Sequence, residues 1–223
     1  MIQSVHVVGS GRAGRTLAAR LLDVGLDVRE GRRVADVDLV LLCVPDTAIA
    51  EVASGIPVGP WVAHVSGATR LSALDPHRRR FSVHPLQTLT LSRGPEQLDG
   101  AWAAISADTS DGLAHARWLV ARLGLHHFEL ADEDRTLYHA AAVIGGNFVV
   151  TLHAVATRLL AAAGAPPEAI VPLMRRTIEN EFELTGPIAR GDWTTVDAHI
   201  AALEERAPDV VALYRALAEA TRR

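Results

Sequence analysis

Lysine is absent from this 223-residue chain, and all 22 of its basic residues are arginine. Without a lysine amine the chain cannot form a Schiff base, use lysine as a general base, or hold phosphates with a P-loop lysine. Acid–base chemistry must therefore fall to histidine, aspartate, glutamate, tyrosine or water. The single cysteine, Cys43, excludes an intramolecular disulfide and a cysteine-based zinc site, and we expect no metal site.

Excess positive charge and aromatic rings are also lacking. A net charge of −4, a pI near 6.2 and 4% aromatic residues argue against a nucleic-acid-binding protein. No basic segment precedes an apolar stretch at the start, so we expect no signal peptide. The most apolar stretch, residues 140–156, is interrupted by Asn147, Thr151 and His153. We expect it to be a buried helix rather than a membrane span, in a cytoplasmic protein without a membrane partner.

The first 130 residues alternate between strand and helix patterns. Apolar runs predict strands at residues 5–8, 26–29, 39–44, 61–65, 81–83 and 101–106, and helices are expected at 12–24 and 47–53. Such alternation is typical of a parallel α/β sheet. We predict a Rossmann-type domain over residues 1–130.

Only helical patterns follow Leu130. Helices are expected at residues 132–163 and 166–182, then from Trp193 after an Asp192 cap, and finally from Pro208. We therefore predict a second, all-helical domain over residues 131–223, for substrate binding or dimerisation.

A glycine loop, Gly9-Ser10-Gly11-Arg12-Ala13-Gly14, joins the first predicted strand to the first helix. In such a loop the first glycine permits the tight turn, the second admits a pyrophosphate, and the third lets helix and strand pack closely. This context predicts a dinucleotide site. Loops after the next strands should reach the same sheet edge, so the expected cofactor contacts are Gly9, Ser10, Gly11, Arg12, Ala13, Gly14, Val44, Pro45, Ser66 and Gly67.

Residues near the end of the second strand bear on the choice of cofactor. Glu30 stands where an acid would bind the ribose 2′-hydroxyl of NAD. Arg29, Arg32 and Arg33 would instead hold the 2′-phosphate of NADP, or they are simply solvated. We favour NADP and keep NAD as the alternative. The connection over residues 31–38 is too short for a crossover helix, which places normal adenosine binding in question.

Two histidines and an asparagine are the candidate catalytic residues. His84 follows a predicted strand end and is a candidate general acid, unless it is a loop histidine bonded to backbone. His139 and Asn147 share one stripe of the long predicted helix, where His139 would donate a proton and Asn147 would orient the substrate. A contact between helices satisfies Asn147 equally well. Tyr138 lies about 100° away and is expected to pack.

A Gly/Pro-rich loop at residues 185–192 supplies the candidate substrate contacts, Thr185 and Arg190. Arg190 would bind a substrate carboxylate or cofactor phosphate, or it pairs structurally with Asp192. His199, in the following helix, fits a surface or interface role as well as a catalytic one.

Together these motifs resemble a family of Rossmann-like proteins whose C-terminal half is the domain of unknown function 2520. The carriers, besides residues 9–14, are Val44-Pro45-Asp46, His64-Val65-Ser66-Gly67-Ala68, His84-Pro85-Leu86-Gln87-Thr88, Tyr138-His139-Ala140-Ala141, Asn147, residues 184–192 and His199. The resemblance implies a fold similar to pyrroline-5-carboxylate reductase, ketopantoate reductase and 6-phosphogluconate dehydrogenase. It also implies use of NADP or NAD and a homodimer formed through the helical domain.

The missing lysine departs from the β-hydroxyacid dehydrogenase relatives, which use a catalytic lysine. It favours a reductase that protonates a carbonyl or imine of a small polar substrate through histidine or water. The alternatives are a non-enzymatic dinucleotide or small-ligand sensor, or a degenerate oxidoreductase whose helical domain serves assembly.

Overall fold

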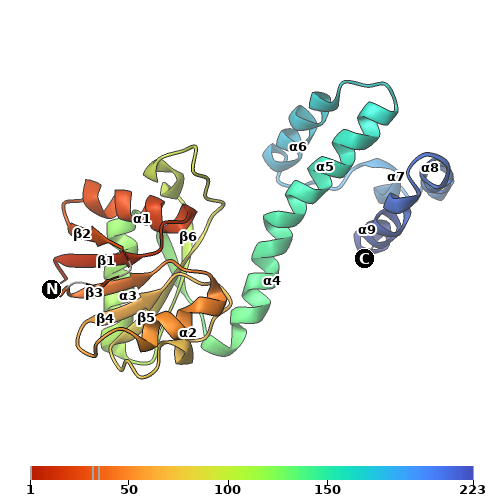
Figure 1. Cartoon of the computed structure of the whole chain (residues 1–223). Coiled ribbons are helices and arrows are strands. Elements are labelled where there is room, and N and C mark those ends of the chain that lie inside the picture. The colour runs from red at the N-terminus through yellow and green to blue at the C-terminus, as the bar shows by residue number, and fades with distance from the viewer. Residues whose placement is uncertain (1, 32, 35, 223) are drawn as a thin grey trace. The chain divides into compact units, whose positions relative to one another are not determined.

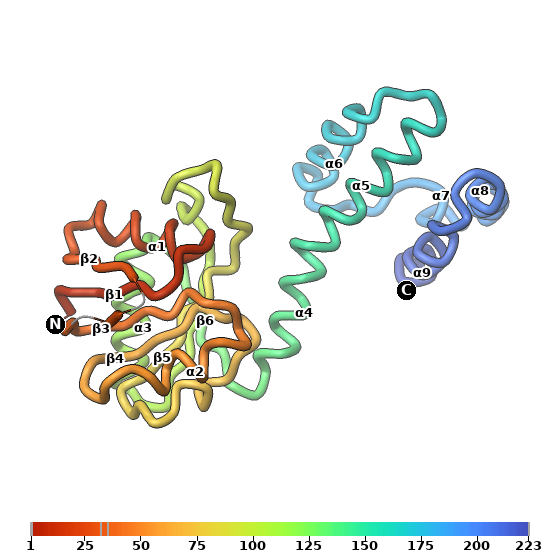
Figure 2. Tube along the Cα trace, viewed as in Figure 1, coloured from red at the N-terminus to blue at the C-terminus, as the bar shows by residue number. Residues whose placement is uncertain are grey.

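The computed structural model describes residues 2–31, 33–34 and 36–222 and divides into two compact units, Met1–Ile144 and Gly145–Arg223 (Figures 1 and 2). The sequence places the boundary at 130/131, where the last strand, β7 (His126–Glu129), has just ended. The compact units divide later, near the end of helix α4 (Arg135–Gly145). The first residue of α4, Arg135, is buried in the first unit, which attaches the start of this helix to the sheet.

The first unit is built on a seven-stranded sheet in the order β2-β1-β3-β4-β5-β6-β7. All neighbouring strands are parallel except β5 and β6, which are antiparallel, so the predicted parallel sheet is confirmed apart from this one pair. The connection between these two strands contains only a short 3-10 turn, η3 (Pro95–Leu98), and lacks the crossover helix that a parallel pair needs. Besides β7, the strands are β1 (Ser4–Val8), β2 (Asp27–Glu30), β3 (Leu39–Leu42), β4 (Trp61–His64), β5 (Arg80–Leu86) and β6 (Trp102–Ala107).

Helices cover both faces of this sheet, as the near-continuous apolar strands require. On one face, α1 (Arg12–Asp23) and α3 (Ser110–Leu123) bury Leu17 and Leu119 against Leu39 and Leu41 of β3. On the other, α2 (Ile49–Ser54) and the 3-10 turn η2 (Leu71–Leu74) pack against the alternate residues of the same strand. Because successive side chains of a strand point to opposite faces of the sheet, Leu39 and Leu41 belong to one core, and Val40 and Leu42 belong to the other.

Two connections determine the shape of the carboxyl edge, the edge of the sheet at which the parallel strands have their C-terminal ends. No helix lies among the described residues between β2 and β3, as the short spacing predicts. β5 is longer than predicted: His84, Pro85 and Leu86 belong to the strand, not to a loop after it. Antiparallel pairing with β6, in which His84 opposes Ala104, extends β5 beyond the end of β4.

The second unit is helical throughout its described residues. The predicted helix over 132–163 is interrupted at Gly146, after which α5 (Asn147–Ala162) begins. Asp192 caps α8 (Trp193–Arg206) as predicted, because its Oδ1 accepts a hydrogen bond of 3.1 Å from the Thr195 amide. The remaining helices are α6 (Ile170–Glu179), α7 (Gly186–Ala189) and α9 (Val211–Arg222).

The expectation that residues 140–156 form a buried helix is wrong for this chain. α5 and α6 contain no buried residue, and the unit's core cluster is small, centred on Leu203, Ala207 and Val210. Among the described residues, the helical stretch Asp132–Ala162 is long and apolar enough to cross a membrane by length and composition, and none of its apolar window is buried within the chain. Within the described residues of the second unit, α5 and α6 therefore leave a large apolar surface exposed.

Candidate active site at the carboxyl edge of the sheet

Strand order and register bring the predicted cofactor loops to one sheet edge. Val8 of β1 pairs with Leu42 of β3, and Leu42 pairs with His64 of β4, so these three strands end side by side. The strand order reverses at β1, because β2 is added on one side of it and β3 on the other, and open α/β sheets bind ligands at such a point. The glycine loop and the segments containing Val44, Pro45, Ser66 and Gly67 begin at this edge.

Two glycines of the loop are required by the fold. Gly9 has a φ of +120°, and a Cβ added there would overlap the Cys43 carbonyl oxygen. A Cβ at Gly14 would overlap the carbonyl oxygen of Gly9. The chain therefore needs both glycines whether or not it binds a ligand.

Gly11 is different, because nothing lies within 4 Å of a Cβ added there. It is the N-cap residue of α1, with φ −73° and ψ −172°, a conformation open to any residue. No side chain caps this helix, and its first turn has no acidic residue. The free amides and the space beside Gly11 fit a pyrophosphate at a helix N-terminus.

The residues expected to bind the adenosine half of the cofactor lie near the end of β2, and one of them is already hydrogen-bonded within the chain. Glu30 ends β2, pairs in register with Val7, and is exposed. The Arg29 guanidinium donates to Asp27 Oδ2 at 2.8 Å and to the Asp36 carbonyl at 3.1 Å, so local acceptors already occupy it. Arg33 is exposed, and Arg32 lies outside the described residues.

His84 and His139 come together beside Gly67, although they are 55 positions apart in sequence. Their ring centroids are 6.0 Å apart and their planes are inclined at 77°. A Cβ added to Gly67 would lie 2.8 Å from His139 Cδ2 and 2.9 Å from His84 Cε1. Both imidazoles can therefore approach this turn only because residue 67 has no side chain.

Tyr138, which was expected to pack, is hydrogen-bonded to His84. Its hydroxyl oxygen lies 2.6 Å from His84 Nδ1. Burial lowers the pKa of His84 to about 4, and the charges of His139 and Arg135 act in the same direction. His84 is therefore neutral at pH 7, so any proton that it gives as a general acid comes from the neutral ring. Burial raises the pKa of Tyr138 to about 12, so the phenol keeps its proton.

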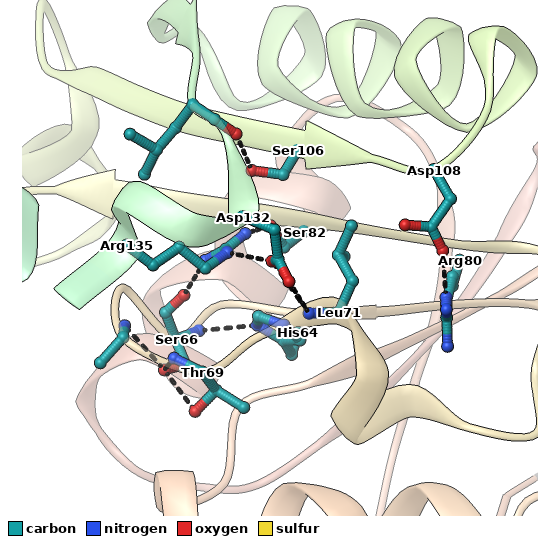
Figure 3. Close-up of polar contacts among 12 residues, drawn as sticks. His64, Ser66, Thr69, Leu71, Arg80, Ser82, Ser106, Asp108, Asp132 and Arg135 are labelled. Carbon is teal, nitrogen blue, oxygen red and sulfur yellow. Dashed lines mark hydrogen bonds and ion pairs between the residues drawn. The ribbon is translucent and has the colours of Figure 1, made fainter.

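Arg135 joins the elements that carry this cluster (Figure 3). Its side chain is 1% exposed, and it donates to Asp132 Oδ1 at 2.8 Å, to the Ser66 carbonyl at 3.1 Å and to the Ser82 hydroxyl. Because Tyr138 and His139 follow it by three and four residues, all three side chains lie on one face of α4. Arg135 thus fixes the helix face that meets His84. Sequence reasoning missed it, although the spacing of Asp132 and Arg135 is that of a helical ion pair.

Ser66 and His64 stabilise the turn that precedes Gly67. His64 is fully buried, and its Nδ1 accepts a hydrogen bond of 3.2 Å from the Ser66 amide. Burial lowers the pKa of His64 to about 3. The Ser66 hydroxyl accepts from the Thr69 amide at 3.0 Å and bonds the Thr69 hydroxyl (Figure 3). The Ser66 hydroxyl is therefore used within its own turn.

The other predicted site residues belong to the second unit. Asn147 is the first residue of α5, while Thr185 and Arg190 flank α7, and all three are exposed. Their proposed roles stay predictions. His199 is paired within its own unit, since its Nδ1 lies 2.8 Å from the Tyr214 hydroxyl.

Two cavities lie away from this cluster. One of about 400 Å³ is at the opposite, amino-terminal edge of the sheet and is lined by Trp61, Arg79 and His115, among others. Another of about 280 Å³ lies between α5, α8 and α9. Neither is lined by the glycine loop or His84, so the candidate site rests on the loop geometry and the histidine cluster.

Solved structures resemble the whole chain. A candidate NADP oxidoreductase from Bacteroides fragilis has a TM-score of 0.84 at 21% identity, covering 99% of this chain and 98% of its own. A protein from Thermotoga maritima has a TM-score of 0.74 at 26% identity, covering 98% and 100%. Pyrroline carboxylate reductase from Plasmodium falciparum, solved with NADP bound, has a TM-score of 0.59 at 12% identity, covering 98% and 97%.

These likenesses show a Rossmann-type fold shared with NAD(P)-dependent oxidoreductases. A sequence comparison with curated proteins finds no match. The family described as "Domain of unknown function (DUF2520)" matches residues 101–221, more than half of the 223 residues. The chain therefore belongs to the DUF2520 family, which confirms the resemblance carried by its motifs.

Proposed function

We propose that this protein is an NAD(P)H-dependent reductase that acts on a carbonyl or imine of a small polar substrate. The observation that carries the proposal is the open space at Gly11, beside the uncapped N-terminus of α1, at the same sheet edge as His84 and His139. The fold shared with NAD(P)-dependent oxidoreductases supports it.

The chain's residues divide into holding and proton-transfer roles. The glycine loop and the first amides of α1 would hold the pyrophosphate. When bound, a reduced nicotinamide supplies a hydride to the substrate. His84 and His139 would provide the matching proton near Gly67. Substrate contacts at Asn147, Thr185 and Arg190 of the second unit stay proposals from the sequence.

We propose NADPH rather than NADH as the preferred cofactor. Arg33 is exposed beyond the end of β2 and is available to a 2′-phosphate, whereas Arg29 is held by Asp27 and Asp36. The NADP named for two of the structural relatives supports this choice. Glu30 argues for NADH, so tighter binding of NADH than NADPH would overturn the preference.

A Gly11→Ala variant tests the proposal. The backbone of Gly11 accepts alanine and no atom opposes the new methyl group, so the ligand-free protein should lose only the small stability difference between glycine and alanine at an N-cap. With NADPH at one hundred times its Kd, the native wild type should gain about 2.7 kcal/mol. Gly11→Ala should lose most of that gain, because the methyl group occupies the space expected for the pyrophosphate.

Gly55→Ala is the matched control, since its new Cβ would meet the Val52 carbonyl oxygen at an ordinary 3.5 Å, far in the chain from the loop. An unchanged wild-type melting temperature with both NADPH and NADH would overturn the proposal. Tight binding without NADPH oxidation, across a panel of 2-oxo acids and cyclic imines, would favour a non-enzymatic sensor. The observation that supports that second candidate is the short β2–β3 connection, whose described residues form no helix.

We further propose that a second copy of the chain covers the apolar surface of α5 and α6. Phe148, Val150, Leu173 and Ile178 are each more than half exposed, which is unusual for a soluble monomer. The interruptions by Asn147, Thr151 and His153 favour a protein partner over a lipid one, consistent with a cytoplasmic homodimer.

A further inference from the structure

Tyr138 is held in place from several sides. Its ring contacts Phe128 of β7 with centroids 5.8 Å apart, and it stands edge-on to His84 at 5.5 Å. Its helix begins at the buried Arg135, which is bonded to Ser66 and Ser82. Among the described residues, the Tyr138 hydroxyl has one hydrogen-bond partner, His84 Nδ1. The phenol is therefore fixed with its hydroxyl against His84 Nδ1.

The chemistry of the two groups sets the direction of that hydrogen bond. A neutral imidazole has one N–H donor and one bare nitrogen acceptor, whereas a phenol is a good proton donor. Because a phenol is a much stronger acid than a neutral imidazole, the favourable pairing has the Tyr138 O–H donating to a bare Nδ1. The ring proton of His84 then resides on Nε2.

His84 Nε2 lies on the side of the ring that faces the candidate site. It is 3.0 Å from the position of a Cβ added to Gly67, the same point that His139 approaches. The Nε2–H group of His84 therefore lies next to the Gly67 turn, and Nδ1 lies next to the Tyr138 hydroxyl. The imidazole bridges the phenol and the site.

We propose that Tyr138 is a positioning residue that fixes the proton of His84 on Nε2 and replaces it after transfer to the reduced substrate. This inference rests on the reductase function proposed above. As the substrate oxygen or nitrogen takes the proton, the His84 Nε2–H bond breaks, the Tyr138 O–H bond breaks and an Nδ1–H bond forms. The phenolate left behind regains its proton from Nδ1 when water protonates Nε2. The water that protonates Nε2 is released as hydroxide, so the net change is one proton from water to substrate, which completes the reduction together with one hydride.

The tyrosine makes this transfer feasible from a neutral histidine. Without the phenol proton, donation from Nε2 would leave an imidazolate, a strong base that a half-buried site would destabilise. With it, the negative charge resides on a phenolate, a far weaker base. The variant Tyr138→Phe removes this path by deleting a single oxygen.

The first test reads the position of the proton without any substrate. Nitrogen-15 NMR of the full chain at pH 7 should show His84 protonated on Nε2, with the signals assigned by their loss in His84→Gln. In Tyr138→Phe a substantial Nδ1-protonated form should appear, while the β-sheet amide signals stay in place. Wild-type protein protonated on Nδ1, or an unchanged tautomer in Tyr138→Phe, would overturn the proposal.

The second test measures turnover with NADPH and the panel of 2-oxo acids and cyclic imines, with 1-pyrroline-5-carboxylate as the first imine. Tyr138→Phe should lower kcat about 100-fold, the scale of general acid catalysis, and leave the NADPH Kd unchanged. Phe128→Leu, which keeps the hydroxyl, should change kcat much less. A Tyr138→Phe kcat within twofold of wild type refutes the relay. If the panel gives no turnover, the reductase proposal fails while the tautomer measurement still decides the role of Tyr138.

Discussion

Acidification should destabilise the first unit, because the fold holds His84 and His64 as neutral rings. His84 has a pKa of about 4, and His64 one of about 3, against an unfolded value near 6.5. As the pH falls below 6.5, His84 and His64 become protonated in the unfolded chain but stay neutral in the folded unit. Stability is therefore full above pH 6.5 and declines through the window down to each folded pKa.

The size of the effect follows from these values. Between pH 7.5 and pH 5, the shift of His84 from 6.5 to about 4 predicts a loss of about 2 kcal/mol. Burial is the main cause for His84, and the charges of Arg135 and His139 add to it, while Asp46 opposes it. In His84→Gln, where the amide can still bond Tyr138, this part of the pH dependence should disappear.

The measurement is urea unfolding followed by tryptophan fluorescence. In a Trp193→Phe background the remaining tryptophans, Trp61, Trp102 and Trp118, all report on the first unit. His127→Gln, which removes an exposed histidine on β7, is the matched control and should keep the wild-type dependence. If His84→Gln loses as much stability between pH 7.5 and pH 5 as wild type, His84 is not a buried neutral ring and the reasoning is refuted.

Two further substitutions address the site and the helical surface. Gly67→Ala places a methyl group within 3 Å of both imidazoles, so turnover should fall at least tenfold. A kcat equal to that of Gly55→Ala would contradict the close approach. Phe148→Glu should convert a dimer to monomers, as measured by analytical ultracentrifugation at micromolar concentration, because it places a charge on the apolar surface. Glu168→Gln is the control and should leave the dimer intact. If the wild-type protein sediments as a monomer, the dimer proposal is wrong.

Features with a local signature could be predicted from the sequence. The glycine loop depends on a turn, a strand and a helix that are neighbours in the chain, and the Asp192 cap needs only the amide of Thr195. The short connection between β2 and β3 is evident from the spacing. These features are encoded within a few residues, so pattern reasoning reaches them.

Features that depend on contacts between residues far apart in the chain could not be predicted from the sequence. The length of β5 depends on antiparallel pairing with β6, so His84 was assigned to a loop. The prediction for Tyr138 assumed that His139 and Asn147 define the working face of one long helix. The helix is interrupted at Gly146, and the buried Arg135 turns both Tyr138 and His139 towards the first unit. Arg29, expected at a phosphate, instead bonds an acid two residues away.

The three glycines of the loop carry different kinds of information. A descendant that had stopped binding dinucleotides would still need glycine at positions 9 and 14 to fold, because backbone atoms fill the space that a side chain would take. At position 11 it could gain a side chain without a steric clash. Glycine at positions 9 and 14 can thus be retained in a protein that binds no dinucleotide, because the fold requires it there. Glycine at position 11 is the part of the motif that points to a bound pyrophosphate.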